Sequence, residues 1–517
     1  MARKEIDKTK SATFNEGAIN DNFKELYEGA GGGGGGGISL DDLKAEVTEG
    51  EYGTSVVIGE SYKIESVPSR LIRDVNTIRF IKDVNDNKIN VSINYGHEPN
   101  MVIHDGKAYI VYDYSETATG EVWNLPSGKT LDTATDAELK RLLRTRLSIV
   151  NLATMQIISH VMIAQPKDVV NYEGDDHKII ACGNPNIAYM GNNIMRITID
   201  GAAGCIAYRD YNISTGELGT ITPCTFTGSI RSTASSPVVL TLANYITHFV
   251  DNSTTIQMHS QYAKIGSKYY ILIGSGDAGS ICPIFTTEDF KTFTYWDKPH
   301  TRVKTGGTDN NPVYTRADMT GLGYEMALFP WRNNAGESKV RLVFAMRGTA
   351  NAQPMKVGAI SSGVNYSVSG NSVTFSENGD EKGVIELYAE IPVDQNRPHF
   401  FAPVAGANDA ANAVKQGAIY LMYGCPGQEF NYREFMNVLA FSGNNSFVPS
   451  TMRVVAQGLR MTYTTISYYN GWYYVAYQGH GQPHVYLSKF KPFSANWDKV
   501  ISALGRMFDI FEPKNNT

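Results

Sequence analysis

The chain has 517 residues, of which 42% are apolar, 11% aromatic and only 19% charged. Average soluble domains carry about 25% charged residues, so we expect a surface that is polar rather than ionic. The net charge of −6, from 46 basic and 52 acidic residues, excludes a strongly basic surface for nucleic acid. The length accommodates about two to four ordinary domains or one large repetitive one.

Residues 1–10 are charged and lead into no apolar segment, so we expect no secretory signal peptide. The longest apolar region, 147–164, is interrupted by polar residues, and we expect no membrane insertion. The cysteines are scattered and never have CxxC spacing, which is typical of reduced, buried thiols. They are Cys182, Cys205, Cys224, Cys282 and Cys425. We expect no metal site and no cofactor.

The first thirty residues differ in character from the rest. Apolar residues recur at helical spacing and predict one stripe of a short amphipathic helix, formed by Ile19, Phe23, Leu26 and Tyr27. A helix of about ten residues is marginal in water, so this stripe needs a partner surface. Seven consecutive glycines, 31–37, follow it and predict a flexible tether. We therefore interpret 1–30 as an anchor and 31–50 as a tether and neck.

The segment AINDNFKELY, residues 18–27, resembles the N-terminal element of many bacteriophage tail-fibre and virion-appendage proteins. In those proteins a similar stretch precedes a Gly-rich or coiled-coil neck and then a receptor-facing β-structure. The resemblance implies a virion protein, synthesised in the host cytoplasm, whose residues 1–37 bind other virion proteins. It also implies a homotrimer.

From residue 51 onward, short runs rich in Val, Ile, Tyr and Thr alternate with turn residues and predict an all-β body. Two helical insertions are expected, over 135–146 with a capping box of Thr135 and Glu138, and over 240–250. One phrase, a turn followed by an aromatic or β-branched run, recurs as a repeat of strands. Its copies lie at 106–112, 204–208, 266–274, 339–346, 417–424 and 470–478.

A polar residue followed by proline stands upstream of most of these phrases, as at Glu98-Pro99 and Asn184-Pro185. Proline cannot donate to a central ladder and belongs at the start of a strand. The repeated order of the two elements favours a β-propeller over 51–517, with about six blades and five as the alternative. A β-sandwich or a β-helix array is the other fold that these patterns allow.

Residues 98–112 resemble the opening blade of five-bladed glycosidase propellers of the arabinanase and fructosidase kind. The segment TTEDFKTFTYW, 286–296, is similar to their blade ends and, more loosely, to the Asp-box of sialidases. These similarities imply a fold and leave the activity open.

Hydrolysis of a glycan requires two facing carboxylates. In the five-bladed family an Asp stands directly before the first-blade proline, and this chain has Glu98 there, flanked by His97. The corresponding positions of later repeats carry no carboxylate, and nothing in the spacing selects Asp277 or Glu325 as the partner. A glycan-cleaving tailspike is therefore the alternative interpretation.

Binding suits the loops better, because aromatic and amide side chains supply contact area and adaptable hydrogen bonds. We expect contacts to a host-surface glycan or protein from Trp331, Arg332, Asn333, Arg397 and Tyr463. The alanine-rich stretch 402–414 is expected to be a plain surface loop. The function that these patterns favour is a phage tail or head fibre that binds a host receptor, with a purely structural virion component as a further alternative.

Overall fold

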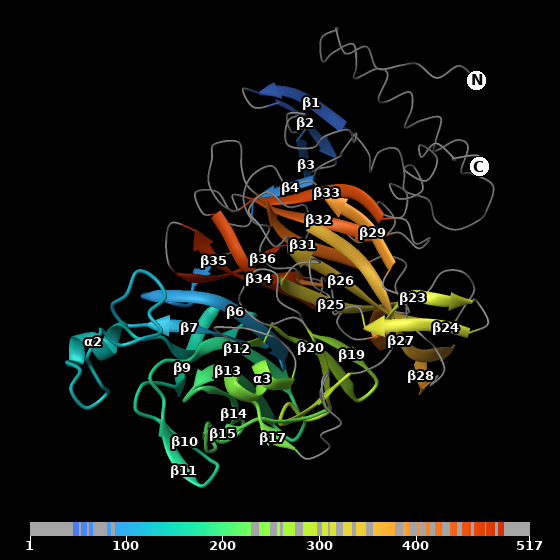
Figure 1. Cartoon of the computed structure of the whole chain (residues 1–517). Coiled ribbons are helices and arrows are strands. Elements are labelled where there is room, and N and C mark those ends of the chain that lie inside the picture. Colours follow the sequence, from blue (N-terminus) through green and yellow to red (C-terminus); the bar gives the residue numbers. More distant parts are fainter. Residues whose placement is uncertain are drawn as a thin grey trace, which may run out of the picture.

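The computed structural model of the chain consists mostly of β-strands (Figure 1). From 88 to 296 it describes 88–228, 237–248, 256–258, 262–274 and 283–296. Elsewhere it describes 45–50, 53–58, 62–65, 80–83, 302–308, 311–316, 324–332, 338–347, 355–377, 386–391, 402–403, 410–413, 419–425, 435–441, 447–455, 460–470, 472–480 and 484–490, many of them by backbone alone. Within these residues no helix is long and apolar enough to span a membrane. The expected all-β class is confirmed.

Three four-stranded antiparallel sheets carry the site described below. Sheet 1 consists of β6 (Tyr95–His104), β7 (Lys107–Ser115), β8 (Arg144–Asn151) and β9 (Gln156–Ala164). Sheet 2 consists of β12 (Gly183–Tyr189), β13 (Ile194–Ala202), β14 (Cys205–Asn212) and β15 (Thr222–Pro223). The composite sheet joins β34 (Arg460–Tyr469), β35 (Trp472–His480) and β36 (Val485–Phe490) to β5 (Ile89–Asn90), which comes from the other end of the described chain.

The next part of the chain forms two further sheets. The first has the order β17-β16-β22-β21-β20-β18, with β19 on β20: β16 (Thr225–Thr227), β17 (Val238–Val239), β18 (Gln257–Met258), β19 (Ala263–Ile265), β20 (Lys268–Gly274), β21 (Ile284–Thr287) and β22 (Thr292–Tyr295). The second contains β25 (Tyr324–Arg332), β26 (Lys339–Arg347), β27 (Met355–Ser369), β28 (Ser372–Glu377) and β29 (Glu386–Ile391).

The remaining strands form one large sheet and two hairpins. The large sheet has the order β1-β2-β3-β4-β33-β32-β31-β30: β1 (Ala45–Gly50), β2 (Gly53–Ile58), β3 (Tyr62–Glu65), β4 (Phe80–Asp83), β30 (Ala402–Pro403), β31 (Ile419–Cys425), β32 (Phe435–Phe441) and β33 (Phe447–Val455). The hairpins are β10 (Val169–Tyr172) with β11 (Asp175–Lys178), and β23 (Arg302–Thr308) with β24 (Asn311–Arg316). Residues 45–50 of the expected neck are thus a strand.

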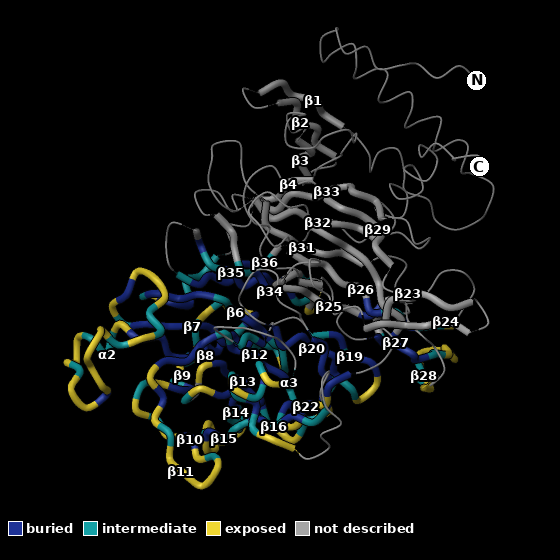
Figure 2. Tube along the Cα trace, in the orientation of Figure 1, coloured by how far each residue is buried: buried dark blue, intermediate teal, exposed yellow. Residues whose placement is uncertain are grey.

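Neighbouring sheets pack face to face and share apolar cores. On β7, Tyr109 and Val111 face sheet 2, whereas Ile110 and Tyr112 face the composite sheet. Sheet 2 packs in turn on the sheet of β20, and the sheet of β20 packs on that of β25. A strand covered on both faces buries consecutive side chains, which explains the unbroken run of buried residues along β7. Figure 2 shows this burial along the inner strands, with exposed residues concentrated in the outer loops.

The part of the chain that the structure describes contains few and short helices: α2 (Asp136–Arg141), α3 (Leu242–His248) and α4 (Ala410–Ala413). The expected capping box is present, since Thr135 and Glu138 bond reciprocally. The expected end at 146 is wrong, because Leu142 adopts an extended conformation and β8 begins at Arg144. The second expected helix is confirmed by α3. The expectation of a plain loop over 402–414 is also wrong, since β30 and α4 lie there and Ala410 is fully buried.

All six copies of the recurring phrase overlap strands, namely β7, β14, β20, β26, β31 and β35. They do not mark the same strand of each sheet: β7 and β35 are second in theirs, whereas β14 is third. Of the cysteines, Cys182, Cys205 and Cys224 are buried free thiols, as expected.

Candidate functional site

The first strands of three sheets share one irregularity. In β6 the register shifts between His97 and Asn100, in β12 between Gly183 and Asn186, and in β34 between Thr462 and Thr465. Inside each shift one non-glycine residue has positive φ: 46° at Glu98, 44° at Asn184 and 46° at Tyr463. Such conformations cost about 1–3 kcal/mol each and cluster at functional sites.

These bulges change the direction of the side chains at the start of each strand. They also place His97 of β6 directly opposite Asp113 of β7 in the antiparallel ladder. His97 Nδ1 lies 3.5 Å from Asp113 Oδ2 and 4.0 Å from Glu98 Oε1. One ligand atom from each of these three residues lies within 4.8 Å of the other two. We call His97, Glu98 and Asp113 the acid–histidine cluster.

Two further side chains contact the imidazole of His97. On its other nitrogen, Nε2 lies 3.2 Å from Glu121 Oε1, and the indole of Trp123 donates to Glu121 Oε2 over 3.1 Å. The ring of Tyr463, from the composite sheet, has its centroid 4.1 Å from that of His97. The cluster therefore lies where sheet 1 meets the composite sheet, and strands β6 and β34 are neighbours there (Figure 1).

The exposed fraction of these side chains increases from Asp113 to Glu121. The side chain of Asp113 is completely buried and that of His97 is 7% exposed, whereas Glu98 is 19% and Glu121 42% exposed. Burial raises the pKa of Asp113 to about 6, and the adjacent His97 opposes the rise. Burial also raises the pKa of Tyr95, and the negative charges of Glu121, Asp113 and Glu98 act in the same direction.

Asp113 is enclosed by sheet 2. A Cβ atom added to Gly183 would lie 2.8 Å from Asp113 Oδ1 and 2.9 Å from Trp123 Cη2. No donor among the described residues reaches an Asp113 oxygen or His97 Nδ1 with normal hydrogen-bond geometry, although His97 and the Asn184 backbone N–H lie close enough to Asp113 to lower its pKa. Leaving buried polar atoms without partners is costly, which makes this arrangement uncommon in a folded protein.

Sheet 2 repeats the acid but not the cluster. Asp200 of β13 lies opposite Gly183, as Asp113 lies opposite His97. Its Oδ2 accepts the Met258 backbone N–H over 2.8 Å, and burial raises its pKa well above the usual range. Because glycine stands where sheet 1 has histidine, this position cannot supply the same chemistry.

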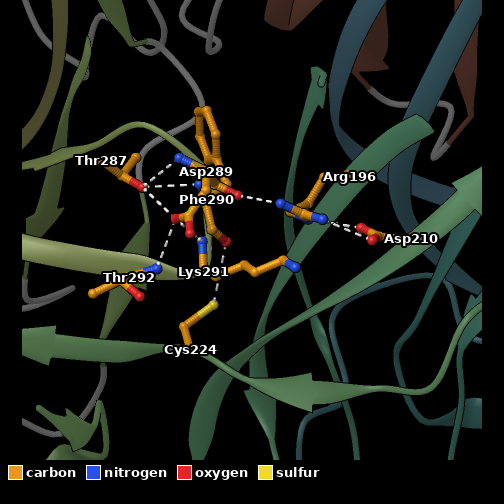
Figure 3. Close-up of polar contacts among 8 residues, drawn as sticks. All are labelled: Arg196, Asp210, Cys224, Thr287, Asp289, Phe290, Lys291 and Thr292. Atoms are coloured by element: carbon orange, nitrogen blue, oxygen red, sulfur yellow. Dashed lines mark hydrogen bonds and ion pairs between the residues drawn. The ribbon is translucent and has the colours of Figure 1, made fainter. Parts of the chain in front are cut away.

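The segment that resembles an Asp-box forms a structural turn between β21 and β22 (Figure 3). Asp289 Oδ1 accepts two backbone N–H groups, from the residues that follow Phe290, over 2.8 and 2.9 Å. Arg196 binds both oxygens of Asp210 at 2.7 Å and also donates to the Asp289 carbonyl. This arginine is engaged in structure and does not reach the acid–histidine cluster by any contact in the described residues.

Of the expected site residues, the structure brings Glu98 and Tyr463 together. Glu325, Trp331 and Arg332 lie on β25, where the structure describes their backbone but not their side chains. The others lie outside the described residues: Asp277, Asn333, Arg397 and the anchor residues Ile19, Phe23, Leu26 and Tyr27.

Sequence reasoning did not select Asp113, Glu121 or His97 itself. One signal was available, namely an aspartate inside the otherwise apolar strand sequence KAYIVYDYS. A carboxylate there must be buried, and buried carboxylates usually have a specific partner.

No protein-family model and no curated protein sequence matches this chain. Among solved structures, Trypanosoma rangeli sialidase in complex with sialic acid is similar over 84% of this chain and 58% of that chain, at 10% identity and a TM-score of 0.44. The endosialidase of phage phi92 is similar over 82% of this chain and 72% of its own, at 9% identity and a TM-score of 0.44. The catalytic domain of the Coprinopsis cinerea GH62 α-L-arabinofuranosidase is similar over 68% and 91% of the two chains, at 11% identity and a TM-score of 0.33. This chain thus covers little more than half the length of the trypanosomal sialidase.

Proposed function

We propose that the chain is a phage virion appendage whose body is a β-propeller of about six blades, and that this body binds a host-surface glycan beside the acid–histidine cluster. Face-to-face packing of sheets in chain order supports the propeller, as does the completion of the composite sheet by β5. Both features are what a ring of blades requires.

The observation that carries the binding proposal is the convergence of Glu98, Glu121 and Tyr463 on His97. Carboxylate oxygens accept hydrogen bonds from hydroxyl groups, and a tyrosine ring offers a rigid apolar face with a polar tip. Partly exposed acids beside such a ring suit a polyhydroxylated ligand. Trp331, Arg332, Asn333 and Arg397 remain proposed as further contacts.

A glycan array with the purified full-length chain tests this proposal. Tyr463→Ala should weaken binding at least tenfold, because it removes the ring that adjoins His97. Tyr469→Ala is the matched control, since Tyr469 is an exposed tyrosine on the same strand, and it should stay within twofold of the wild type. Equal losses in both variants, or no glycan bound by the wild type, would contradict the proposal and favour a purely structural role.

Glycan cleavage is the second candidate, because Glu98 and Asp113 have oxygens within 4.8 Å of one another. Retaining glycosidases hold their two carboxyl groups about 5–5.5 Å apart. The complete burial of Asp113 favours binding over cleavage in this conformation. Release of reducing sugar by the wild type but not by Glu98→Gln would establish hydrolysis.

The anchor is proposed from the sequence alone. Residues 1–37 bind other virion proteins, and the appendage is a homotrimer located in the virion. Deleting 1–37 should leave a folded body that no longer assembles into particles, as followed by immunoblotting of purified virions. Normal incorporation of the deletion would contradict the anchor.

A further inference from the structure

We propose that the acid–histidine cluster is a binding site for a divalent cation, held by His97 Nδ1, a Glu98 carboxylate oxygen and an Asp113 carboxylate oxygen. The site lies beside the proposed glycan contacts, but the inference stands without them. Four features of the cluster support it.

The first feature is the set of unpartnered atoms. Asp113 is completely buried, and the two donors nearest to it, His97 and the Asn184 backbone N–H, do not reach its oxygens with normal hydrogen-bond geometry. In the described part of the chain no lysine or arginine forms an ion pair with it. An ionised carboxylate in such surroundings costs several kcal/mol unless a cation compensates it.

The second feature is the orientation of the imidazole. The contact of 3.2 Å between Nε2 and Glu121 Oε1 favours the tautomer that carries its proton on Nε2. Nδ1 then presents a lone pair toward Asp113 and Glu98, at 3.5 and 4.0 Å. The Nδ1 lone pair and the two carboxylates repel one another when nothing lies between them. A cation bound between them would attract all three.

The third feature is the support around the first ligand. Metal-binding histidines usually donate their other N–H to a carboxylate, which fixes the ring and raises its basicity. Glu121 occupies this position, and Trp123 fixes Glu121 by donating to its second oxygen over 3.1 Å. Glu121 is therefore a positioning residue of the site.

The fourth feature is the spacing of the ligand atoms. Ligands about 2.1 Å from a tetrahedral ion lie about 3.4 Å from one another. The separation of 3.5 Å between His97 Nδ1 and Asp113 Oδ2 fits this value. Glu98 Oε1 lies 4.0 Å from His97 Nδ1, and all three ligand atoms lie within 4.8 Å of one another, so ion binding requires the partly exposed Glu98 side chain to move inward.

The ligand set indicates the class of ion. Imidazole with two carboxylates suits Zn²⁺ or Mn²⁺ better than Ca²⁺ or Mg²⁺, which prefer oxygen ligands alone. Three protein ligands leave at least one position open to water or to a hydroxyl group. If the proposed glycan function is correct, a sugar hydroxyl would complete the coordination.

The test is titration of the EDTA-treated full-length protein with Zn²⁺, Mn²⁺ and Ca²⁺ separately, by calorimetry and without glycan. We expect one equivalent of Zn²⁺ or Mn²⁺, bound at least tenfold more tightly than Ca²⁺. His97→Gln and Asp113→Asn should each weaken binding at least 100-fold, and Glu121→Ala by about 10–100-fold.

Asp200→Asn is the matched control, because Asp200 is the buried acid at the equivalent position of sheet 2, and it should retain full affinity. Circular dichroism verifies the fold of each variant. Absence of binding of all three ions at millimolar concentration would overturn the site. Unchanged affinity in folded His97→Gln would overturn it equally. Metal binding without any glycan binding would support the site and contradict only the proposed function.

Discussion

The Asn100 side chain donates from Nδ2 to Oδ1 of Asn186 over 2.9 Å, and this bond joins the first strands of sheets 1 and 2. Both residues are buried, and both follow the bulge of their strand. Each Oδ1 also accepts the next backbone N–H of its own chain segment. The pair is therefore a repeated element that locks neighbouring bulges together.

Replacing Asn186 by alanine should lower the free energy of unfolding by about 1–3 kcal/mol, because two buried donors lose their acceptor. Urea denaturation measures this loss, and a double-mutant cycle with Asn100→Ala should give a coupling of about 1 kcal/mol. Asn171→Ala is the control, since its bond to Asp176 is exposed, and it should cost less than about 0.5 kcal/mol. Additive single losses would contradict the coupling.

Replacing Gly183 by alanine should disturb the packing of sheet 2 against Asp113. The new Cβ would lie under 3 Å from both Asp113 Oδ1 and Trp123 Cη2, so we expect a loss of about 1–3 kcal/mol. Gly120→Ala is the matched control, because a Cβ there meets nothing within 4 Å, and it should change stability by less than about 1 kcal/mol. Equal melting temperatures for the two variants would show that sheet 2 does not enclose Asp113.

The turn at Asp289 should tolerate asparagine but not alanine. Asp289→Ala removes the acceptor of two backbone N–H groups and should destabilise the protein by about 1–3 kcal/mol. Asp289→Asn keeps an acceptor oxygen and should lose less than half as much. Chemical denaturation of both variants tests the difference, and identical losses would point to charge rather than to hydrogen bonding.

The free energy of unfolding should decrease as the pH rises above about 9. Burial raises the pKa of Cys182 and that of Cys205 to about 12, from an ordinary value of 9.0. Between these pH values the unfolded chain has released protons that the folded chain retains, so stability falls as pH rises, by up to about 1.4 kcal/mol per unit for each group. Below pH 9 this contribution is fully present.

Denaturation curves between pH 8 and 11 measure this slope, and Cys205→Ala should reduce it. In the same window, iodoacetamide should label Cys182 and Cys205 only after urea is added. Rapid labelling of both in the native protein at pH 9 would disprove their burial.

Local sequence signals predicted those features that depend on local chemistry. The capping box of Thr135 and Glu138 and the turn at Asp289 both involve residues within a few positions of each other. The expected strand start at Glu98-Pro99 is wrong, because β6 begins at Tyr95 and this pair lies in its bulge, where the missing N–H of proline is tolerated. Hydrogen bonds between near neighbours form in the same way whatever the rest of the chain does.

The candidate site could be predicted only in part, because its residues come together through strand pairing and sheet packing, which the local sequence does not determine. Asp113 faces His97 since β6 and β7 pair with a bulge, and a shift by one residue would turn its side chain to the other face. Tyr463 arrives from a different sheet altogether. Likewise, Leu142 and Leu143 continue a helical pattern but end in a core with Tyr95, so packing overrides the local preference.

The joining of β5 to β36 sets a time constraint on folding. Asn94 and His484, which are bonded beside this junction, are 390 residues apart. At synthesis rates of about 5–20 residues per second, the second partner emerges tens of seconds after the first. During that interval the face of β7 that carries Ile110 and Tyr112 has no composite sheet to cover it. Non-local pairing of this kind makes folding slow and exposes apolar surface to aggregation, so the nascent chain should depend on chaperones until its last strands are made.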